Sequence, residues 1–577
     1  MFNIQANKQV VWLIVIITVI ILSLSSLCYN LGHSVSTQLS LLLVVCSLLF
    51  SVYVNNYANS FTKNELIFFL FLLGLGLVFF QNKSIQNIYL VGLMFCVFLF
   101  LKRIGIKNHI PISIGLVLYA IFEGLYGIVT FHANLTGAIG HFDNAAGFAV
   151  VQVAIIPFSI HLLTVQKKAM KFIGIIGLLI AVVAIYLSES RSGVFSASAL
   201  VVLYLIYGCR DKLLRFSSFK KFAVGITCLI GLLTFILILY QIKKDSANGR
   251  LLIWKCSINM VLEKPLLGYG TSGFKTRYMF YQAAYLKDKP ESPYANLADD
   301  VTHPFNEYLD IIVKYGIIGF VAFLFLLVLL IKSVRVDFKQ KKYAFFSTLG
   351  VLIFGFFSYP FQYTTLIIIM TINLWICLSL YNPEPRIFLS RLVAKPILSI
   401  GLAFAGLFLL YNTIGLMKND REWGKIREES MKFGKVDDVI SKYENLLKRG
   451  FEKESFLFNY GARLNQSGDY RKSIQIFEKC MQHVDNSQIQ TYMADNYLNL
   501  GDYVVAEEYA QNARYMRPST FLPLYHLVII YNETARYEEA QTLALHIIDK
   551  PMKIHNANSH LIKYKMKQYT ETGVLEL

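Results

Sequence analysis

Polar residues able to do chemistry occur in four short groups within an otherwise apolar sequence. The groups are residues 140–147 (GHFDNAAG), 188–193 (SESRSG), 249–254 (GRLLIW) and 302–309 (THPFNEYL). Histidine, with an unperturbed pKa of about 6.5, can accept a proton at neutral pH. Arginine binds phosphate or carboxylate oxygens through two parallel hydrogen bonds. These residue types suit proton transfer by His141 or His303 and anion binding by Arg191 or Arg250.

Each group also has a purely structural explanation. A lone Arg191 commonly caps a helix end or reaches lipid headgroups, and His141 and His303 can be ordinary loop residues. The stretch 268–273 (GYGTSG) satisfies the G-x-G-x-x-G pattern, but no buried strand precedes it, so we interpret its glycines as loop geometry. A functional interpretation requires that the groups lie on one side of a membrane.

The elements that position these groups are membrane helices. Of the 577 residues, 55% are hydrophobic and only 16% charged, which excludes a disordered, collagenous or disulfide-rich protein. Apolar runs long enough to span a bilayer predict an all-α polytopic protein with about thirteen spans. The expected spans are 10–29, 39–55, 65–81, 85–101, 110–131, 144–164, 170–187, 192–208, 222–242, 308–331, 343–359, 364–381 and 395–416.

The net charge of +18 is a topology signal. With the N-terminus inside, the short outer loops hold only Lys83 and Arg191, whereas the inner loops are rich in Lys and Arg. Nucleic-acid binding then has no support. The long loop 243–307, the four polar groups and the C-terminal part all fall on the extracytoplasmic face. We therefore expect a multi-pass protein of a bacterial inner membrane, in contact with lipid.

Residues 418–577 form a separate polar domain with an internal repeat. Residues 434, 468, 501 and 535 align at spacings of 34, 33 and 34 residues, and Ser473, Ala506 and Ala540 fall at matching places. This helix-turn-helix period is similar to tetratricopeptide repeats, whose concave surface usually binds a protein or peptide. An unrelated helical bundle is the alternative.

The order of several motifs resembles the O-antigen ligase and polymerase family. Ser-Arg-Ser-Gly is followed by Gly-Arg-x-x-x-Trp, Lys-Pro-Leu-Leu-Gly-Tyr-Gly, a long loop, His-Pro-x-Asn-Glu-Tyr-Leu and Lys-Tyr-Gly-Ile-Ile-Gly at 314–319. The resemblance covers about residues 180–330 and implies transfer of a glycan from a polyprenyl pyrophosphate carrier to an acceptor. It implies His303 as the catalytic residue and Arg191 and Arg250 as pyrophosphate ligands.

Weaker candidates for binding the glycan or acceptor are Asn306, Tyr308, His141 and Asn144. Many family members read His-x-His-Asn or His-Asn, whereas Pro304 and Phe305 here separate His303 from Asn306. Which of His303 and Asn306 meets the acceptor therefore stays open.

Because such a lipid-linked donor arrives already activated and no pair of carboxylates is spaced for a metal, we expect a transferase without metal or other cofactor, and single displacement would invert the anomeric centre. The acceptor is lipid A core, a growing glycan or a Ser/Thr hydroxyl of a protein, so a ligase, a polymerase and a protein O-oligosaccharyltransferase are all candidates. A transporter or flippase is a further alternative, because Glu123, Gly124 and Gly127 lie within an expected span. A scaffold built around the repeats is the last alternative.

Overall fold

The computed structural model describes most of the chain. The described residues are 15–25, 60–61, 65, 67–72, 74–75, 85–104, 109–131, 137–211, 215–378, 387–388, 395–430, 436–553 and 555–574. They form two compact units. The first unit comprises Met1–Leu239, Phe305–Tyr308 and Val321–Asp420, and the second comprises Tyr240–Pro304, Leu309–Phe320 and Arg421–Leu577.

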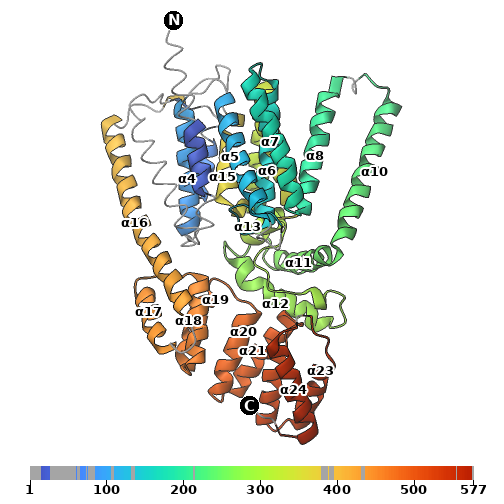
Figure 1. Cartoon of the computed structure of the whole chain (residues 1–577), viewed down its shortest axis with the longest axis vertical. Helices are drawn as coiled ribbons and strands as arrows, with labels where there is room; N and C mark the ends of the chain where they lie inside the picture. The colour runs from blue at the N-terminus through green and yellow to red at the C-terminus, as the bar shows by residue number, and fades with distance from the viewer. Residues whose placement is uncertain are drawn as a thin grey trace. The chain divides into compact units, whose positions relative to one another are not determined.

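The first unit is built almost entirely of apolar helices (Figure 1). They are α4 (Ile85–Ile104), α5 (Ile110–Val129), α6 (Ala145–Thr164), α7 (Lys168–Leu187), α8 (Arg191–Gly208), α10 (Ser218–Ile242), α14 (Phe338–Gly355), α15 (Thr364–Leu378), the later part of α13 (Glu307–Val336) and the first part of α16 (Lys395–Ser430). Two short strands, β1 (Ser60–Phe61) and β2 (Ile387–Phe388), pair antiparallel. The all-α membrane fold expected from hydropathy is confirmed.

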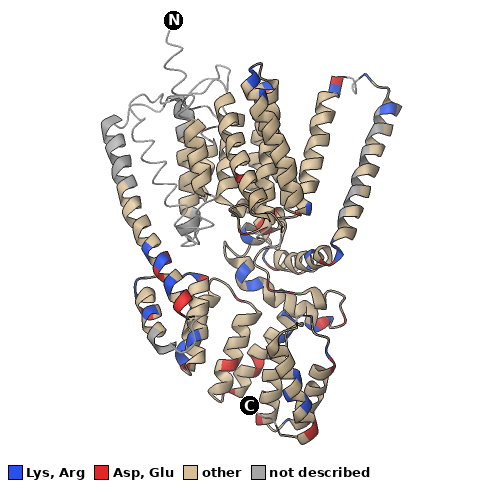
Figure 2. Cartoon of the chain, in the orientation of Figure 1, with Lys and Arg blue, Asp and Glu red and all other residues tan. Residues whose placement is uncertain are grey.

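Five helices of the described part are long and apolar enough to cross a membrane: α5, α6, α7, α8 and α13. Shorter apolar helices at Val15–Ser25, Ile88–Leu99 and Thr364–Leu378 fall within three other expected spans. The expected span 39–55 lies outside the described residues. In Figure 2 the ribbon is coloured for charged residues mainly at the ends of α7, α8 and α10.

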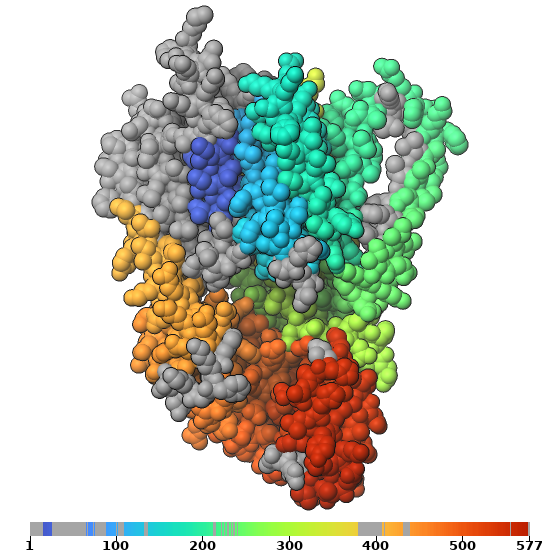
Figure 3. All heavy atoms as spheres, viewed as in Figure 1, coloured from blue at the N-terminus to red at the C-terminus, as the bar shows by residue number. Residues whose placement is uncertain are grey.

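Helix α6 is the most buried of these five and packs against α5, α7, α8 and α14. Glycines on its neighbours permit this packing: a Cβ on Gly127 would lie 2.5 Å from the Phe148 ring, and one on Gly174 would lie 2.7 Å from the Ser159 carbonyl oxygen. In the space-filling view the atoms of α5 and α7, which also contact one another, lie side by side (Figure 3). Helices α7, α8 and α13 expose most of their apolar surface, as lipid contact requires.

The expected continuous span 308–331 is wrong in one respect, because α13 is two helices merged across a kink at Gly316. Gly316 has φ 64°, a left-handed conformation that most side chains disfavour. Residues Leu309–Phe320, which include the kink, cluster with the second unit. Hydropathy does not register the break, because the residues that flank Gly316 are themselves apolar.

The second unit contains α11 (Lys244–Glu263), α12 (Gly273–Asp288), the short helix η3 (Ala295–Leu297) and a series of antiparallel helices. The series is α17 (Val436–Lys448), α18 (Glu454–Gln466), α19 (Tyr470–Met481), α20 (Ser487–Asn499), α21 (Tyr503–Met516), α22 (Leu522–Glu533), α23 (Tyr537–Asp549) and α24 (Ala557–Thr572).

The turns before α19, α21 and α23 share one conformation. Gly468, Gly501 and Ala535 have φ of 83°, 78° and 58°, at spacings of 33 and 34 residues. The small residues predicted to allow close packing, Ser473, Ala506 and Ala540, are all fully buried. Residue 434, the first position of the predicted repeat, lies outside the described residues. The helices thus stack as hairpins, and the assignment to tetratricopeptide repeats stays a prediction.

The long loop packs against these hairpins. Gln282 Nε2 donates a hydrogen bond to the carbonyl oxygen of Met516 at 2.6 Å, and Ser487 Oγ donates to Asp300 at 2.8 Å. The expected domains separate at residues 416–418, with the loop counted in the membrane domain. The compact units instead place 240–304 with the repeats, which sequence could not reveal because the contacting residues are about 200 positions apart.

Candidate functional site

In the first unit, His141 is buried against Glu123. Its Nδ1 lies 3.1 Å from one carboxylate oxygen, and its backbone N–H donates to the other oxygen at 2.7 Å. The imidazole stacks on Tyr126 at a centroid distance of 3.7 Å. A Cβ on Gly140 would lie 2.4 Å from Glu123 Oε1, so the glycine allows the loop to approach the carboxylate. The pair anchors the loop to α5.

Asn144 is the N-cap of α6. Its Oδ1 accepts hydrogen bonds from the backbone N–H groups of Ala146 and Gly147, at 2.9 and 3.0 Å. Its Nδ2 donates to the hydroxyls of Tyr363 at 2.7 Å and Tyr359 at 3.2 Å. Because these bonds already engage both ends of the amide, a role of Asn144 in holding sugar hydroxyls stays a prediction.

Arg191 is the first residue of α8. Ser190 caps this helix by accepting a hydrogen bond from Gly193 N–H at 3.2 Å, and Glu189 turns the chain with φ 52°. A helix N-terminus carries partial positive charge, so a cation there is intrinsically unfavourable. An anion at this point would interact favourably with both the guanidinium and the helix end. The Arg191 side chain is partly exposed, which makes it accessible to such an anion.

Hydrogen bonds join three connecting segments at one end of the first unit. Ala138 N–H donates to the Leu187 carbonyl oxygen at 2.9 Å, linking the loop before α6 to the turn before α8. Ser192 Oγ donates to the Phe357 carbonyl oxygen at 3.3 Å, linking that turn to the segment before α15. The structure thus brings together the segments that carry His141, Asn144 and Arg191.

Residues 305–308 belong to the same unit. Phe361 N–H donates to the Glu307 carboxylate at 3.2 Å, and Tyr308 OH donates to the Leu352 carbonyl oxygen at 2.6 Å. Phe305 has φ 52° and packs edge-on against Tyr359 at 5.2 Å. The two residues that interrupt the family pattern therefore form a sharp turn before Asn306. The Tyr308 hydroxyl is engaged with the backbone, so its role as a sugar ligand stays a prediction.

In the second unit, Trp254 holds the segment that contains His303. Its indole Nε1 donates to the Pro304 carbonyl oxygen at 2.9 Å. Arg250 lies four residues before Trp254 on α11, so the two side chains project from the same face of the helix. The structure thereby brings Arg250 to the side of α11 that faces the His303–Pro304 segment. Arg250 is partly exposed.

His303 lies in an electropositive environment. Burial, together with Lys314 and Lys275, lowers the pKa of His303 to about 3. Lys314 forms an ion pair with Asp310, and Lys275 with Glu454 at 3.1 Å. The imidazole is therefore neutral at physiological pH, with a nitrogen lone pair that can accept a proton. The sequence did not identify Lys275, which is 28 residues away from His303.

Two glycine-rich motifs, which the sequence shows only as separate features, bond to one another. Tyr269 N–H donates to the Val313 carbonyl oxygen at 2.9 Å, and Gly270 N–H donates to that of Lys314 at 2.9 Å. A Cβ on Gly268 would lie 2.5 Å from the Val313 carbonyl oxygen. These contacts support the interpretation of 268–273 as loop geometry, and they fix the position of Lys314.

The remaining residues that sequence analysis missed are Tyr359, Tyr363 and Glu307, which hold the connecting segments of the first unit. Only their proximity in the fold identifies them, since Asn144 and Tyr363 are 219 residues apart. Across the described residues, no group of three His, Cys, Asp or Glu side chains is arranged to hold a metal ion.

Comparison with known proteins agrees with the motif order. Residues 176–324 match the O-antigen ligase family. A Rickettsia conorii protein named as a polysaccharide ligase is 33% identical over 124 residues, 21% of this chain. The chain covers 28% of the length of that relative. The matched residues 176–324 include Arg191, Arg250 and His303, and in this region the chain is similar to the O-antigen ligase family.

Proposed function

We propose that this protein transfers a glycan from a polyprenyl pyrophosphate carrier to an acceptor hydroxyl on the outer face of a bacterial inner membrane. The observation that supports the proposal is the position of His303, in a segment that is hydrogen-bonded to the helix of Arg250 and lies inside the family match. The proposal predicts that the repeats and the loop 243–307 lie outside the cytoplasm.

His303 acts as the general base. The acceptor oxygen attacks the anomeric carbon while its proton passes to a ring nitrogen of His303. The bond from the anomeric carbon to the pyrophosphate oxygen breaks, and the carrier leaves with that electron pair. A single displacement inverts the anomeric centre. The low pKa of His303 rises when the anionic donor binds nearby, because negative charge stabilises the imidazolium.

Arg191 and Arg250 bind the pyrophosphate. Each guanidinium can form paired, charge-assisted hydrogen bonds with phosphate oxygens, and these strengthen as the leaving group gains charge. Arg191 adds the partial positive charge of the α8 N-terminus. Since the donor arrives already activated, the reaction needs no nucleoside triphosphate. His141, Asn144, Asn306 and Tyr308 line or position the surroundings of the glycan and acceptor.

The structure removes the main support for a transporter, which was a carboxylate within an expected span. Glu123, the carboxylate within an expected span, is fully buried and bonded to the side chain and backbone of His141. This arrangement gives Glu123 a structural role in anchoring a loop. The contacts of the repeats with the loop favour a role for the repeats in transfer, including transfer to a protein acceptor.

The experiment is complementation of a deletion strain with wild type, His303→Ala or His560→Ala, at matched membrane protein levels. His560 is an exposed histidine on α24 and serves as the control. We expect His303→Ala to leave a lipopolysaccharide or glycoprotein band missing while lipid-linked glycan accumulates, and His560→Ala to restore it. The band that returns identifies the acceptor as lipid A core, glycan or protein. Full restoration by His303→Ala would refute the catalytic assignment.

A further inference from the structure

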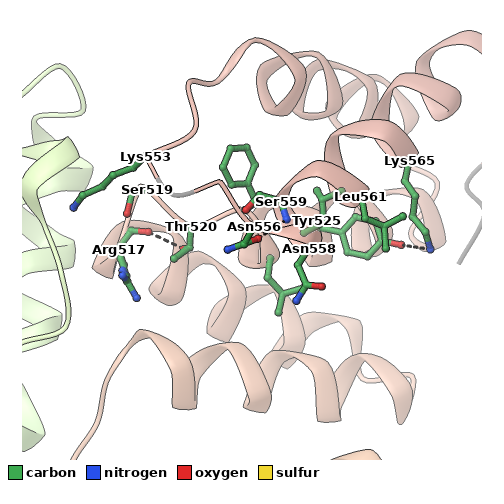
Figure 4. A pocket seen from close by; sticks show the side chains of 13 residues that line it. Arg517, Ser519, Thr520, Tyr525, Lys553, Asn556, Asn558, Ser559, Leu561 and Lys565 are labelled. Atoms are coloured by element: carbon green, nitrogen blue, oxygen red, sulfur yellow. Dashed lines mark hydrogen bonds between the residues drawn. The ribbon is translucent and has the colours of Figure 1, made fainter. Parts of the chain in front are cut away.

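A cavity of about 460 Å³ lies at the C-terminal end of the repeats (Figure 4). It is bounded by the loop that follows α21, the N-terminus of α22 and the N-terminus of α24. Three cations line it, Arg517, Lys553 and Lys565, and none of the described lining residues is acidic. In Figure 4, Arg517 and Lys553 lie toward one side of the cavity and Lys565 toward the other.

The surroundings of the cavity add positive charge. Lys550 donates to the backbone carbonyl oxygen of Thr520 at 3.3 Å and also bonds to that of Pro518, which holds the loop that forms one wall. Burial, with Arg514 and Lys563, lowers the pKa of Lys550 to about 8. The region therefore carries an excess of positive charge, which an anionic ligand would offset.

The N-termini of α22 and α24 also favour an anion in the cavity. Phe521, the N-cap of α22, makes no side-chain capping bond, so this end of the helix depends on other acceptors for its N–H groups. Asn556 caps α24 by accepting from Ser559 N–H at 2.8 Å. Both helix ends contribute partial positive charge at the cavity wall. Combined with the three cations, they give the cavity wall a positive character that would favour an anion.

The other residues that line the cavity can bind a sugar. Ser519, Thr520 and Asn558 supply hydroxyl and amide groups, which match the donor and acceptor pattern of sugar hydroxyls. Tyr525 supplies an aromatic ring, and its hydroxyl accepts from Lys565 Nζ at 3.5 Å. A ligand pocket of several hundred Å³ with an apolar floor and a few polar groups accommodates a ligand of one or two sugar rings.

We propose that this cavity binds an anionic saccharide, a glycan unit that bears carboxylate or phosphate groups. The acidic groups contact Arg517 and Lys553 at one side and Lys565 at the other, and a sugar ring packs on Tyr525. Preference for an anion follows from Lys553 and Lys565, together with Arg517, which also pairs with Asp299 and Asp300. The choice of a saccharide rests on the proposed function, because a glycan-transferring protein meets such ligands.

Arg517 connects the cavity to the loop that carries His303. Its guanidinium Nε lies 3.0 Å from Asp299, four residues before His303, and its Nη1 lies 3.9 Å from Asp300. A bound anion competes with these carboxylates for Arg517. Occupation of the cavity therefore loosens or shifts the loop within the same compact unit.

The test is equilibrium binding to the purified full-length protein in lipid nanodiscs, by calorimetry. The probes are digalacturonate, which carries two carboxylates, its neutral counterpart galactobiose, inorganic phosphate and tetraglutamate. We expect saturable digalacturonate binding, at least tenfold weaker binding of galactobiose, and only weak competition by phosphate. The double variant Lys553→Ala/Lys565→Ala should weaken digalacturonate binding at least tenfold.

Lys567→Ala is the matched control, since Lys567 is an exposed lysine on α24 that does not line the cavity. Circular dichroism melting shows whether each variant is folded. No digalacturonate binding, or equal affinity in the double variant, would overturn the proposal. Tighter binding of tetraglutamate would replace the saccharide with an acidic peptide, and equally tight binding of phosphate would reduce the site to one for a simple anion. A transfer defect with normal binding affects only the proposed function.

Discussion

The indole Nε1 of Trp254 donates a hydrogen bond to the carbonyl oxygen of Pro304 at 2.9 Å. This bond ties the residue after His303 to the helix that carries Arg250. The proposed base and one proposed phosphate ligand therefore keep a defined relation within one compact unit.

Replacing Trp254 with Phe should lower transfer while leaving the protein folded. The substitution keeps an aromatic ring but removes the donor, and a neutral hydrogen bond contributes about 0.5–1.5 kcal/mol. We expect a decrease of roughly two- to tenfold in transfer rate, because about 1.4 kcal/mol corresponds to a factor of ten. The measurement is transfer from a lipid-linked donor by the purified protein, and an unchanged rate would show that the bond does not position His303.

In the pH profile of kcat/KM, activity should fall on the acidic side only well below about pH 6.5, the ordinary pKa of histidine. Because the pKa of His303 without bound donor is lowered to about 3, kcat/KM should stay flat from pH 8 down to pH 5. The acidic limb of kcat should lie at higher pH than that of kcat/KM, since bound pyrophosphate raises the pKa of His303. An acidic limb in kcat/KM near pH 6.5 would contradict the buried, electropositive environment of His303.

The lowered pKa of His303 should also make the stability of the folded protein depend on pH. The folded pKa of His303 is below its unfolded value of about 6.5, so the unfolded chain binds more protons as the pH falls from about 6.5 toward 3. The wild type should lose stability over this window relative to His303→Gln, which cannot be protonated. Above pH 7 the difference should not vary with pH. Thermal unfolding in detergent at pH 4, 5, 6 and 8 measures this, and parallel curves would refute the shift.

Arg191→Lys should reduce transfer although the charge is kept. An ammonium lacks the planar pair of donors that matches phosphate oxygens. We expect a loss of about tenfold, given that charge-assisted hydrogen bonds contribute about 1.5–3 kcal/mol, and a larger loss in Arg191→Ala. Arg335→Lys, at the far end of α13, is the control. Equal activity of Arg191→Lys and wild type would argue against a bidentate phosphate contact.

Glu123→Leu should destabilise the protein more than Glu123→Gln. Leucine leaves His141 and its backbone N–H buried without their acceptor, whereas glutamine keeps an acceptor of similar shape. Leaving a buried hydrogen-bonding group without its partner costs about 1–3 kcal/mol. Melting of the purified variants should show the order wild type, Gln, Leu. If both variants melt like wild type, the pair has no structural role and Glu123 regains interest as a functional carboxylate.

Gly316→Ala should lower stability, whereas Gly424→Ala should not. Gly316 has φ 64°, and a Cβ there would lie 2.1 Å from the Leu266 carbonyl oxygen. With ψ −167°, Gly316 is in a region of backbone conformation that essentially only glycine adopts, and such strain costs roughly 1–3 kcal/mol. Gly424 lies within α16, and a Cβ added there would have no neighbouring atom within 4 Å, so alanine should stabilise the helix by up to about 1 kcal/mol. Similar melting temperatures would show that the kink is not required.

Hydropathy and spacing alone determined the class of this protein and the limits of several elements. The runs 110–131, 144–164, 170–187 and 192–208 correspond closely to α5, α6, α7 and α8, because a lipid environment demands long, continuous apolar helices. The repeat spacing likewise located the turns at residues 468, 501 and 535, because each recurring turn needs a left-handed residue. Motif order pointed to the family that residues 176–324 match.

Only the tertiary structure decided which distant residues meet. It paired His141 with Glu123, bonded Asn144 to Tyr359 and Tyr363, and joined the loop at Asp300 to Ser487. It also divided α13 at Gly316. The physical reason is that periodicity and hydropathy record local preferences of the chain, whereas these contacts depend on how helices pack and on which buried polar groups find partners.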